Sequence, residues 1–107
     1  MENTPTEVWN ITDLIAVQPQ AVVSRTLVNQ KSGTVTLFAF DAGQGLSEHT
    51  APYDALVQVL EGEMEITIAG RPYSLKAGQM ILMPASQPHA LRAHSAVKML
   101  LTMIRSG

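Results

Sequence analysis

Three histidines, at positions 49, 89 and 94, carry the most versatile chemistry in this chain of 107 residues. An imidazole changes charge near neutral pH, so it can act as a general base or bind an anion when protonated. Its unprotonated nitrogen also ligates divalent transition metals. The chain has no cysteine, which excludes disulfides, thiolate metal sites and cysteine nucleophiles. We therefore expect any binding or reaction chemistry to centre on imidazoles.

The elements that must position these histidines are short apolar runs separated by turn residues. No apolar period of 3.6 residues persists over ten residues anywhere after residue 20, which predicts an all-β fold. The predicted strands span residues 21–28, 35–40, 55–60, 64–68, 73–75, 80–83, 90–92 and 97–104. Residues 41–45 are predicted to be a loop. The N-terminal segment 1–20 is expected to hold at most one helical turn, with Asn10 or Thr12 as its cap.

Composition narrows the class of protein. A chain of this length with 46% hydrophobic residues is predicted to fold as one domain, 1–107, without the need for stabilising disulfides or metals. The net charge is −2 and basic residues form no block, which argues against a nucleic-acid partner. No apolar run approaches the ~20 residues that a membrane span needs. The first ten residues do not resemble a secretory signal, so we expect a cytoplasmic protein with no membrane partner.

Two stretches resemble the two sequence motifs of the cupin family. The first, residues 43–62, is GQGLSEHTAPYDALVQVLEG, and the second, residues 78–93, is GQMILMPASQPHALRA. Both keep the spacing of the family motifs without an insertion, and fifteen residues separate Gly62 from Gly78. The resemblance implies a small RmlC-like cupin, a double-stranded β-helix or jelly-roll barrel that accounts for nearly the whole chain.

The chain departs from the family at positions that matter for chemistry. Cupins that bind a metal use two histidines and a glutamate from the first motif and one histidine from the second. Carried over to this sequence, those positions are His49, Ala51, Ala55 and His89. The resemblance thus implies either a metal-free pocket with two hydrogen-bonded imidazoles or one divalent ion (Fe, Mn, Ni, Zn or Cu) on His49 and His89. Two further positions that usually hold glycine and asparagine are Ser86 and Ala93, so the family's turn geometry is in question there.

Strand alternation predicts which side chains accompany the two imidazoles. If one strand runs from His49 to Ala55, then His49 and Tyr53 share a face. In the cupin arrangement that face points into the barrel, where Tyr53 would offer its hydroxyl or pack its ring at the rim. His94 has the opposite parity to His89 and is predicted to face outward.

One amide stands inside an apolar run. Gln58 is expected either to hydrogen-bond on the outer sheet or at an interface, or to contact a ligand. The predicted ligand pocket therefore consists of His49, Tyr53, His89 and Gln58.

Three functions fit these residues. The favoured one is a small-molecule-binding cupin of unassigned ligand, with its pocket around His49 and His89. The alternatives are a metal-dependent enzyme of the oxygenase or isomerase type and a non-catalytic structural or regulatory dimer, and whether the chain is an enzyme stays open. Small cupins are commonly homodimers, and the apolar runs 21–28 and 97–104 offer surfaces that would also cover exposed strand edges. A small-molecule ligand and a second copy of the chain are accordingly the expected partners.

Overall fold

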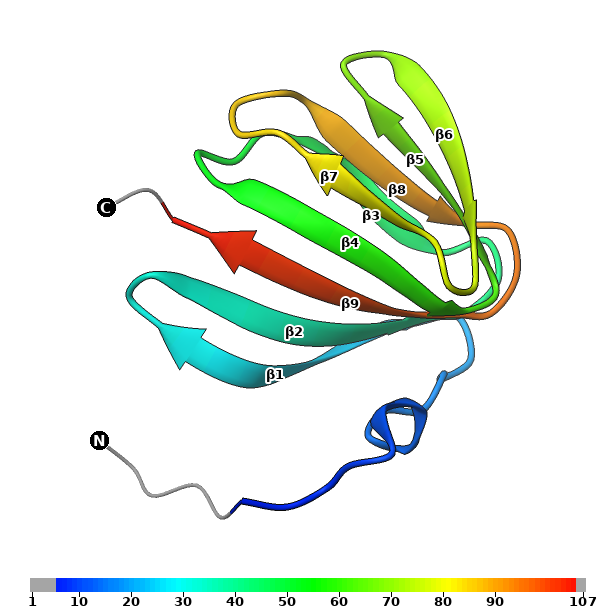
Figure 1. Ribbon diagram of the computed structural model, residues 1–107. Helices are drawn as coiled ribbons and strands as arrows, with labels where there is room; N and C mark the ends of the chain where they lie inside the picture. Colours follow the sequence, from blue (N-terminus) through cyan, green and yellow to red (C-terminus); the bar gives the residue numbers. More distant parts are fainter. Residues whose placement is uncertain (1–5, 106–107) are drawn as a thin grey trace.

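Two antiparallel β-sheets face one another in the computed structural model, which describes residues 6–105 (Figure 1). Within these residues the only helical element is a 3-10 turn, η1 (Ile11–Asp13). The strands are β1 (Val22–Gln30), β2 (Gly33–Phe40), β3 (Gly45–His49), β4 (Asp54–Glu61), β5 (Glu63–Ile68), β6 (Arg71–Lys76), β7 (Met80–Met83), β8 (His89–Ala93) and β9 (Val97–Ile104). In residues 6–105 no helix has the length and apolar character that a membrane crossing needs.

The chain alternates between the sheets, as in a jelly roll. One sheet has the order β1-β2-β9-β4-β7 and the other the order β3-β8-β5-β6. Consecutive strands share a sheet only in the hairpins β1–β2 and β5–β6, and every other connection crosses to the opposite sheet. The predicted all-β jelly-roll barrel is therefore confirmed.

The core lies between the sheets and is built by strand alternation. In β4, Ala55, Val57 and Val59 are buried, whereas Gln58 between them is exposed. The buried core comprises Phe40, Ala55, Val57, Val59, Met64, Ile66, Leu75, Met83, Leu91, Ala93, Val97 and Met99. Apolar side chains from both sheets fill the interior, so the barrel is held together by hydrophobic burial.

Each predicted run coincides with one of the observed strands, but the sequence missed β3. Its first residue, Gly45, falls in the predicted loop, and the strand ends at His49. Residues 50–53 leave the sheet, so the single strand expected from His49 to Ala55 does not exist. The predicted helical turn is present as η1, capped by the Asn10 backbone, with no hydrogen bond from the Asn10 side chain.

Gly62 fixes the sharp turn between β4 and β5. Its φ is +86°, in the left-handed region, and a Cβ atom placed there would overlap the carbonyl oxygen of Ala96. A residue with a side chain would therefore be both strained and obstructed at this position.

Candidate functional site

The pairing of β3 with β8 is irregular just before His49. Leu46 pairs with Leu91 of β8, but the next pair is His49 with His89, so β3 contains one more residue than β8 over this interval. Such a β-bulge shifts the face on which the following side chains lie. Without it, regular pairing would set Glu48 opposite His89. The bulge therefore brings the two imidazoles together.

The two rings contact each other directly. Their Nε2 atoms are 3.1 Å apart, and the ring planes are inclined by 70° with centroids 4.3 Å apart. His89 is buried, 6% exposed, whereas His49 is exposed at the same edge. The pair thus has one ring within the protein and one that reaches solvent.

Both rings are also tied to the backbone through the other nitrogen. His49 Nδ1 lies 2.9 Å from the carbonyl oxygen of Ser47, and His89 Nδ1 lies 3.2 Å from that of Gln87. A carbonyl oxygen only accepts hydrogen bonds, so each Nδ1 must carry a proton to donate. Two neutral rings would then present two unprotonated Nε2 atoms to each other. All three hydrogen bonds form together when one further proton lies between the rings.

Of the two rings, His89 is the one on which burial disfavours the charged form. Burial lowers the pKa of His89 below its ordinary value of 6.5, the hydrogen bond with the Gln87 carbonyl partly opposes this, and the charge of His49 lowers the pKa further. A neutral His89 keeps its Nδ1 proton on the Gln87 carbonyl and leaves its Nε2 free to accept a hydrogen bond from the facing Nε2 of His49.

Two hydrogen bonds join the chain that follows His49 to the loop that precedes His89. The backbone N–H of Ser86 donates to the carbonyl oxygen of Ala51 at 2.8 Å, and that of Ala85 donates to the Asp54 carboxylate at 2.9 Å. Ser86 has φ +65°, so the position where the family motif has glycine keeps a left-handed backbone with a serine in it. Serine therefore occupies here a backbone conformation that glycine adopts at lower cost.

The other predicted pocket residues are less closely associated with the pair. Tyr53 is half-buried, and the Arg105 guanidinium carbon lies 5.2 Å from the centre of its ring. Gln58 lies on the outer face of the five-stranded sheet, because the buried side chains of β4 alternate with it. It therefore does not line the space around the imidazoles, and the outer-sheet interpretation fits its position.

The residues at the remaining motif positions do not complete a metal site. Ala55 is a buried core residue paired with Met83, and Ala51 lies in the connection after β3. Within residues 6–105 there is no group of three or more histidine, cysteine, aspartate or glutamate side chains placed to hold a metal. His49 and His89 present two nitrogens, which is half the ligand set that the family motif supplies.

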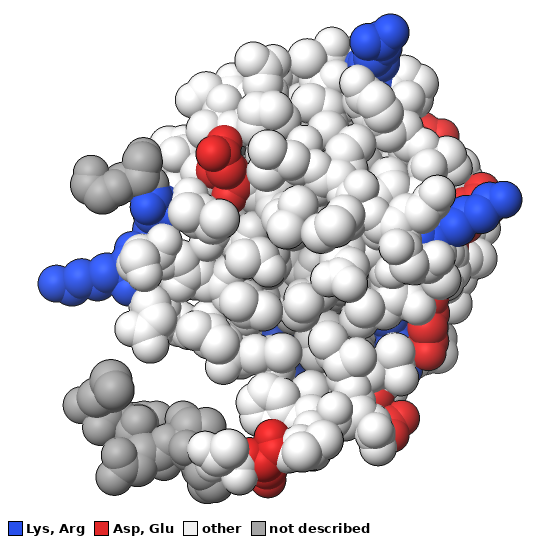
Figure 2. All heavy atoms as spheres, viewed as in Figure 1, with Lys and Arg blue, Asp and Glu red and all other residues white. Residues whose placement is uncertain are grey.

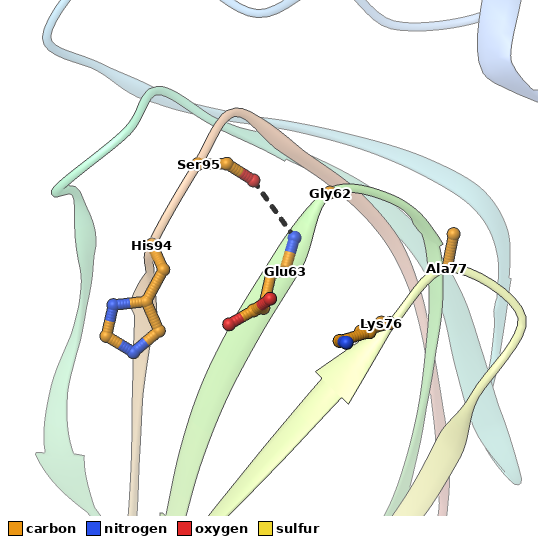
Figure 3. A pocket seen from close by; sticks show the side chains of 6 residues that line it. All are labelled: Gly62, Glu63, Lys76, Ala77, His94 and Ser95. Atoms are coloured by element: carbon orange, nitrogen blue, oxygen red, sulfur yellow. Dashed lines mark hydrogen bonds between the residues drawn. The ribbon is translucent and has the colours of Figure 1, made fainter.

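His94 lies outside the pair, as its parity predicted. It is 44% exposed, and its Nε2 is 3.0 Å from the Glu65 carboxylate. It borders a shallow cavity of about 460 Å³ at the other end of β8, shown in Figure 3, whose lining residues are Gly62, Glu63, Lys76, Ala77, His94 and Ser95. Ser95 accepts a hydrogen bond from the Glu63 backbone, and Glu63 and Lys76 bring opposite charges to the cavity wall. This mixture of charges favours no one class of ligand.

Several features of the candidate site were not predictable from residue types. The acceptors for both Nδ1 atoms are backbone carbonyls, which any residue at positions 47 and 87 would supply. Arg105 was also missed, although its place follows from the pairing of β4 with β9. Asp54 is opposite Ile104, which sets Arg105 next to Tyr53.

Comparisons with known proteins agree with the fold. The family model for the cupin domain matches residues 36–105. A solved structure of a conserved protein of unknown function from Streptococcus pyogenes has 37% sequence identity and a TM-score of 0.92, covering 98% of this chain and 92% of its own. A cupin 2 conserved barrel domain protein from Leptotrichia buccalis has 35% identity and a TM-score of 0.88, covering 91% of this chain and 47% of its own.

One curated relative has a name that describes an activity. The polyketide synthase CurC of Streptomyces cyaneus is 30% identical over 74 residues, which are 68% of this chain and 48% of the relative. The chain thus spans about half the length of this relative.

Proposed function

Because this chain belongs to the cupin domain family, we propose that it is a small-molecule-binding member whose binding centre is the His49–His89 pair. The observation that carries the proposal is that each Nδ1 lies against a backbone carbonyl while the two Nε2 atoms face each other. The rings are thereby held in one orientation with their remaining hydrogen-bonding atoms directed at a common point. Preorganised polar groups of this kind are typical of ligand sites.

The protonation of the His49–His89 pair indicates which class of ligand it would bind. A protonated pair is cationic and offers N–H donors, so it is complementary to a small anion with an oxygen acceptor, such as a carboxylate. The ligand oxygen would replace one imidazole as the partner of the other, and a fourth proton on the pair would let both Nε2 atoms donate to it. Binding should therefore strengthen as pH falls from 8 to 6. Tyr53, in the four-residue connection after His49, is the proposed second contact.

Calorimetric titration with acetate and benzoate at pH 6 and pH 8 tests this function. We expect saturable binding that is tighter at pH 6, that is lost in a His49→Ala/His89→Ala double variant and that is unchanged in His94→Ala. His94 is the matched control because it is an exposed histidine bonded to Glu65 and not to the pair. Absence of binding in the unmodified protein, or binding that survives the double substitution, would contradict the proposal.

A metal-dependent enzyme of the oxygenase or isomerase type is the second candidate. It is favoured by one observation: a histidine that ligates a metal commonly donates its other ring N–H to a carbonyl, as both rings do here. Two protein ligands bind a divalent ion weakly, and the described residues supply no third. The ion would otherwise be held only by water or by a substrate.

Elemental analysis separates the two candidates. Untagged protein, purified without chelator and then incubated with iron, manganese, nickel, zinc or copper, should remain free of stoichiometric metal if the pair binds organic anions. Near one metal per chain, lost in the double variant, would instead favour the enzyme. If neither a metal nor an organic anion binds, the non-catalytic structural dimer becomes the better account.

A further inference from the structure

Arg105 follows directly on β9 and is directed to the inner side of its sheet. Leu101 and Met103 pack against the core, so strand alternation turns the side chain of Arg105, two residues further on, to the same side. Its backbone N–H donates to the carbonyl oxygen of Ser32, in the turn between β1 and β2, at 2.9 Å. Figure 2 shows basic side chains at this end of the molecule, where β9 ends and β1 turns into β2 in Figure 1.

The guanidinium of Arg105 is incompletely hydrogen-bonded. Among residues 6–105, Nη1 donates to the Lys31 carbonyl oxygen over a long 3.4 Å, and the buried Nε has no hydrogen-bond partner. No carboxylate in the described part of the chain forms an ion pair with it. A buried N–H group without a partner forgoes a hydrogen bond that it would make in water. A carboxylate that replaces the long Lys31 contact and also accepts from Nε would therefore complete the contacts of this side chain.

The guanidinium lies over an aromatic ring. The Arg105 Cζ atom is 5.2 Å from the centre of the Tyr53 ring, and a cation at this distance from a ring is attracted to it. Asp54 is the acidic residue next to Tyr53 in the chain, but its carboxylate accepts a hydrogen bond from the Ala85 backbone N–H at 2.9 Å. Tyr53 therefore positions the guanidinium, and Asp54 does not neutralise it.

Tyr53 also relates Arg105 to the imidazole pair. It ends the four-residue connection, 50–53, that starts after His49, and four residues of chain reach at most about 14 Å. Two hydrogen bonds hold this part of the chain beside the loop that precedes His89. The pair and Arg105 accordingly lie around the same end of the barrel.

We propose that Arg105 makes this a site for dicarboxylates: one carboxylate contacts the His49–His89 pair, and the Arg105 guanidinium binds the other. This inference rests on the proposed function and adds the second charged group of the ligand. A guanidinium stays charged at all physiological pH values and donates two parallel hydrogen bonds to a planar carboxylate. Because Nε is buried, the guanidinium turns outward on binding, so that Nε and a terminal nitrogen both donate. A protonated pair and a guanidinium without an acidic partner together match two negative charges.

Calorimetric titration at pH 6 with acetate, malonate, succinate, glutarate and adipate tests the inference. At least one dicarboxylate should bind about tenfold or more tightly than acetate, because it adds a second charge-assisted contact. Arg105→Gln should abolish this advantage and leave acetate binding at the pair unchanged. Arg105→Lys should restore only part of the advantage, since an ammonium group keeps the charge but not the two parallel donors.

Arg92→Gln is the matched control. Arg92 is exposed in β8, on the outer face of the four-stranded sheet, so this variant loses the same charge and should keep every affinity. The inference is overturned if no dicarboxylate binds the unmodified protein more tightly than acetate, a comparison that needs no variant to fold. It is also overturned if Arg105→Gln, with its melting temperature retained, weakens acetate and dicarboxylates by the same factor.

The failure of this inference is distinguishable from that of the proposed function. If acetate binds through the imidazole pair but the second carboxylate adds nothing, only the inference about Arg105 fails. If no anion binds, or if dicarboxylate binding survives His49→Ala/His89→Ala, the proposed function itself fails.

Discussion

The Nε2 atoms of His49 and His89 lie 3.1 Å apart, and each ring has its Nδ1 atom against the carbonyl of the residue two positions earlier in the chain. These three contacts are satisfied together only when the pair holds three protons on its four nitrogens. A fourth proton would add a second positive charge beside the first, and burial disfavours it on His89. This preference of His89 for the neutral form determines how the stability of the protein should respond to pH.

Stability should decrease as the solution is acidified through the range in which His89 resists protonation. The folded-state pKa of His89 is lowered by burial, whereas in the unfolded chain the imidazole titrates near 6.5. The unfolded state thus binds more protons between these two values. The contribution of His89 to stability is fully present above pH 6.5 and is lost as pH falls towards the folded-state pKa.

Urea denaturation between pH 5 and 8 measures this effect. The free energy of unfolding of the unmodified protein should fall over this range by more than that of His89→Asn, in which the titrating group is absent. His94→Gln should retain the pH dependence. Equal slopes for the unmodified protein and His89→Asn would show that burial does not perturb His89.

Gly62→Ala should destabilise the protein more than Gly70→Ala. Both glycines have positive φ, +86° and +80°, but a Cβ at position 62 would overlap the Ala96 carbonyl, whereas at position 70 it meets nothing within 4 Å. The left-handed backbone alone costs a residue with a side chain about 1–2 kcal/mol. We expect a loss of about 1 kcal/mol at Gly70 and about 2 kcal/mol or more at Gly62, measured by thermal or urea unfolding. Equal losses would mean that the turn at Gly62 relaxes freely.

Ser86→Gly should stabilise the protein. Ser86 has φ +65°, so glycine would relieve left-handed strain while it keeps the backbone N–H that donates to Ala51. The gain is reduced by the larger entropy of glycine in the unfolded chain, leaving about 0.5–1 kcal/mol. Ala85→Gly, at a position without positive φ, should destabilise instead. A lower melting temperature for Ser86→Gly would show that the serine side chain stabilises this turn.

The exposed pair of His94 and Glu65 should contribute little. Its atoms are 3.0 Å apart, with both side chains about two-fifths exposed. Such surface pairs are worth about 0.2–1 kcal/mol. A double-mutant cycle with His94→Ala and Glu65→Ala should give a coupling in this range that shrinks in 0.5 M salt. A coupling well above it would assign the pair a structural role.

The apolar runs predicted most of the strands, because strand alternation and turns depend directly on the types of residue along the chain. Strand β3 was missed because Leu46 is its only large apolar residue, and its ladder is completed by the neighbouring β8. His49 was expected to point into the barrel, by an argument from a continuous strand to Ala55 that does not exist; it lies exposed beside the buried His89. The bulge that sets His49 opposite His89 depends on pairing between strands distant in the sequence.

The candidate site was predictable to the level of its two imidazoles. The cupin-like motif spacing pointed to His49 and His89, and strand parity placed His94 outside. The residue types did not show how the rings are oriented, because the Nδ1 atom of each ring contacts a backbone carbonyl, which every residue type has. Gln58 was included in the pocket because an amide in an apolar run suggested a ligand, yet alternation with Val57 and Val59 turns it outward.

The bulge between Leu46 and His49 also makes the chemistry of this edge depend on strand length. Gain of one residue between Leu46 and Glu48, with the bulge retained, would move Glu48 opposite His89 and turn an imidazole couple into a carboxylate–imidazole couple, with no change in the type of any existing side chain. A one-residue insertion would therefore place a carboxylate, in place of a second imidazole, beside His89. Such length changes are a route of divergence for this barrel that substitution scanning alone would not sample.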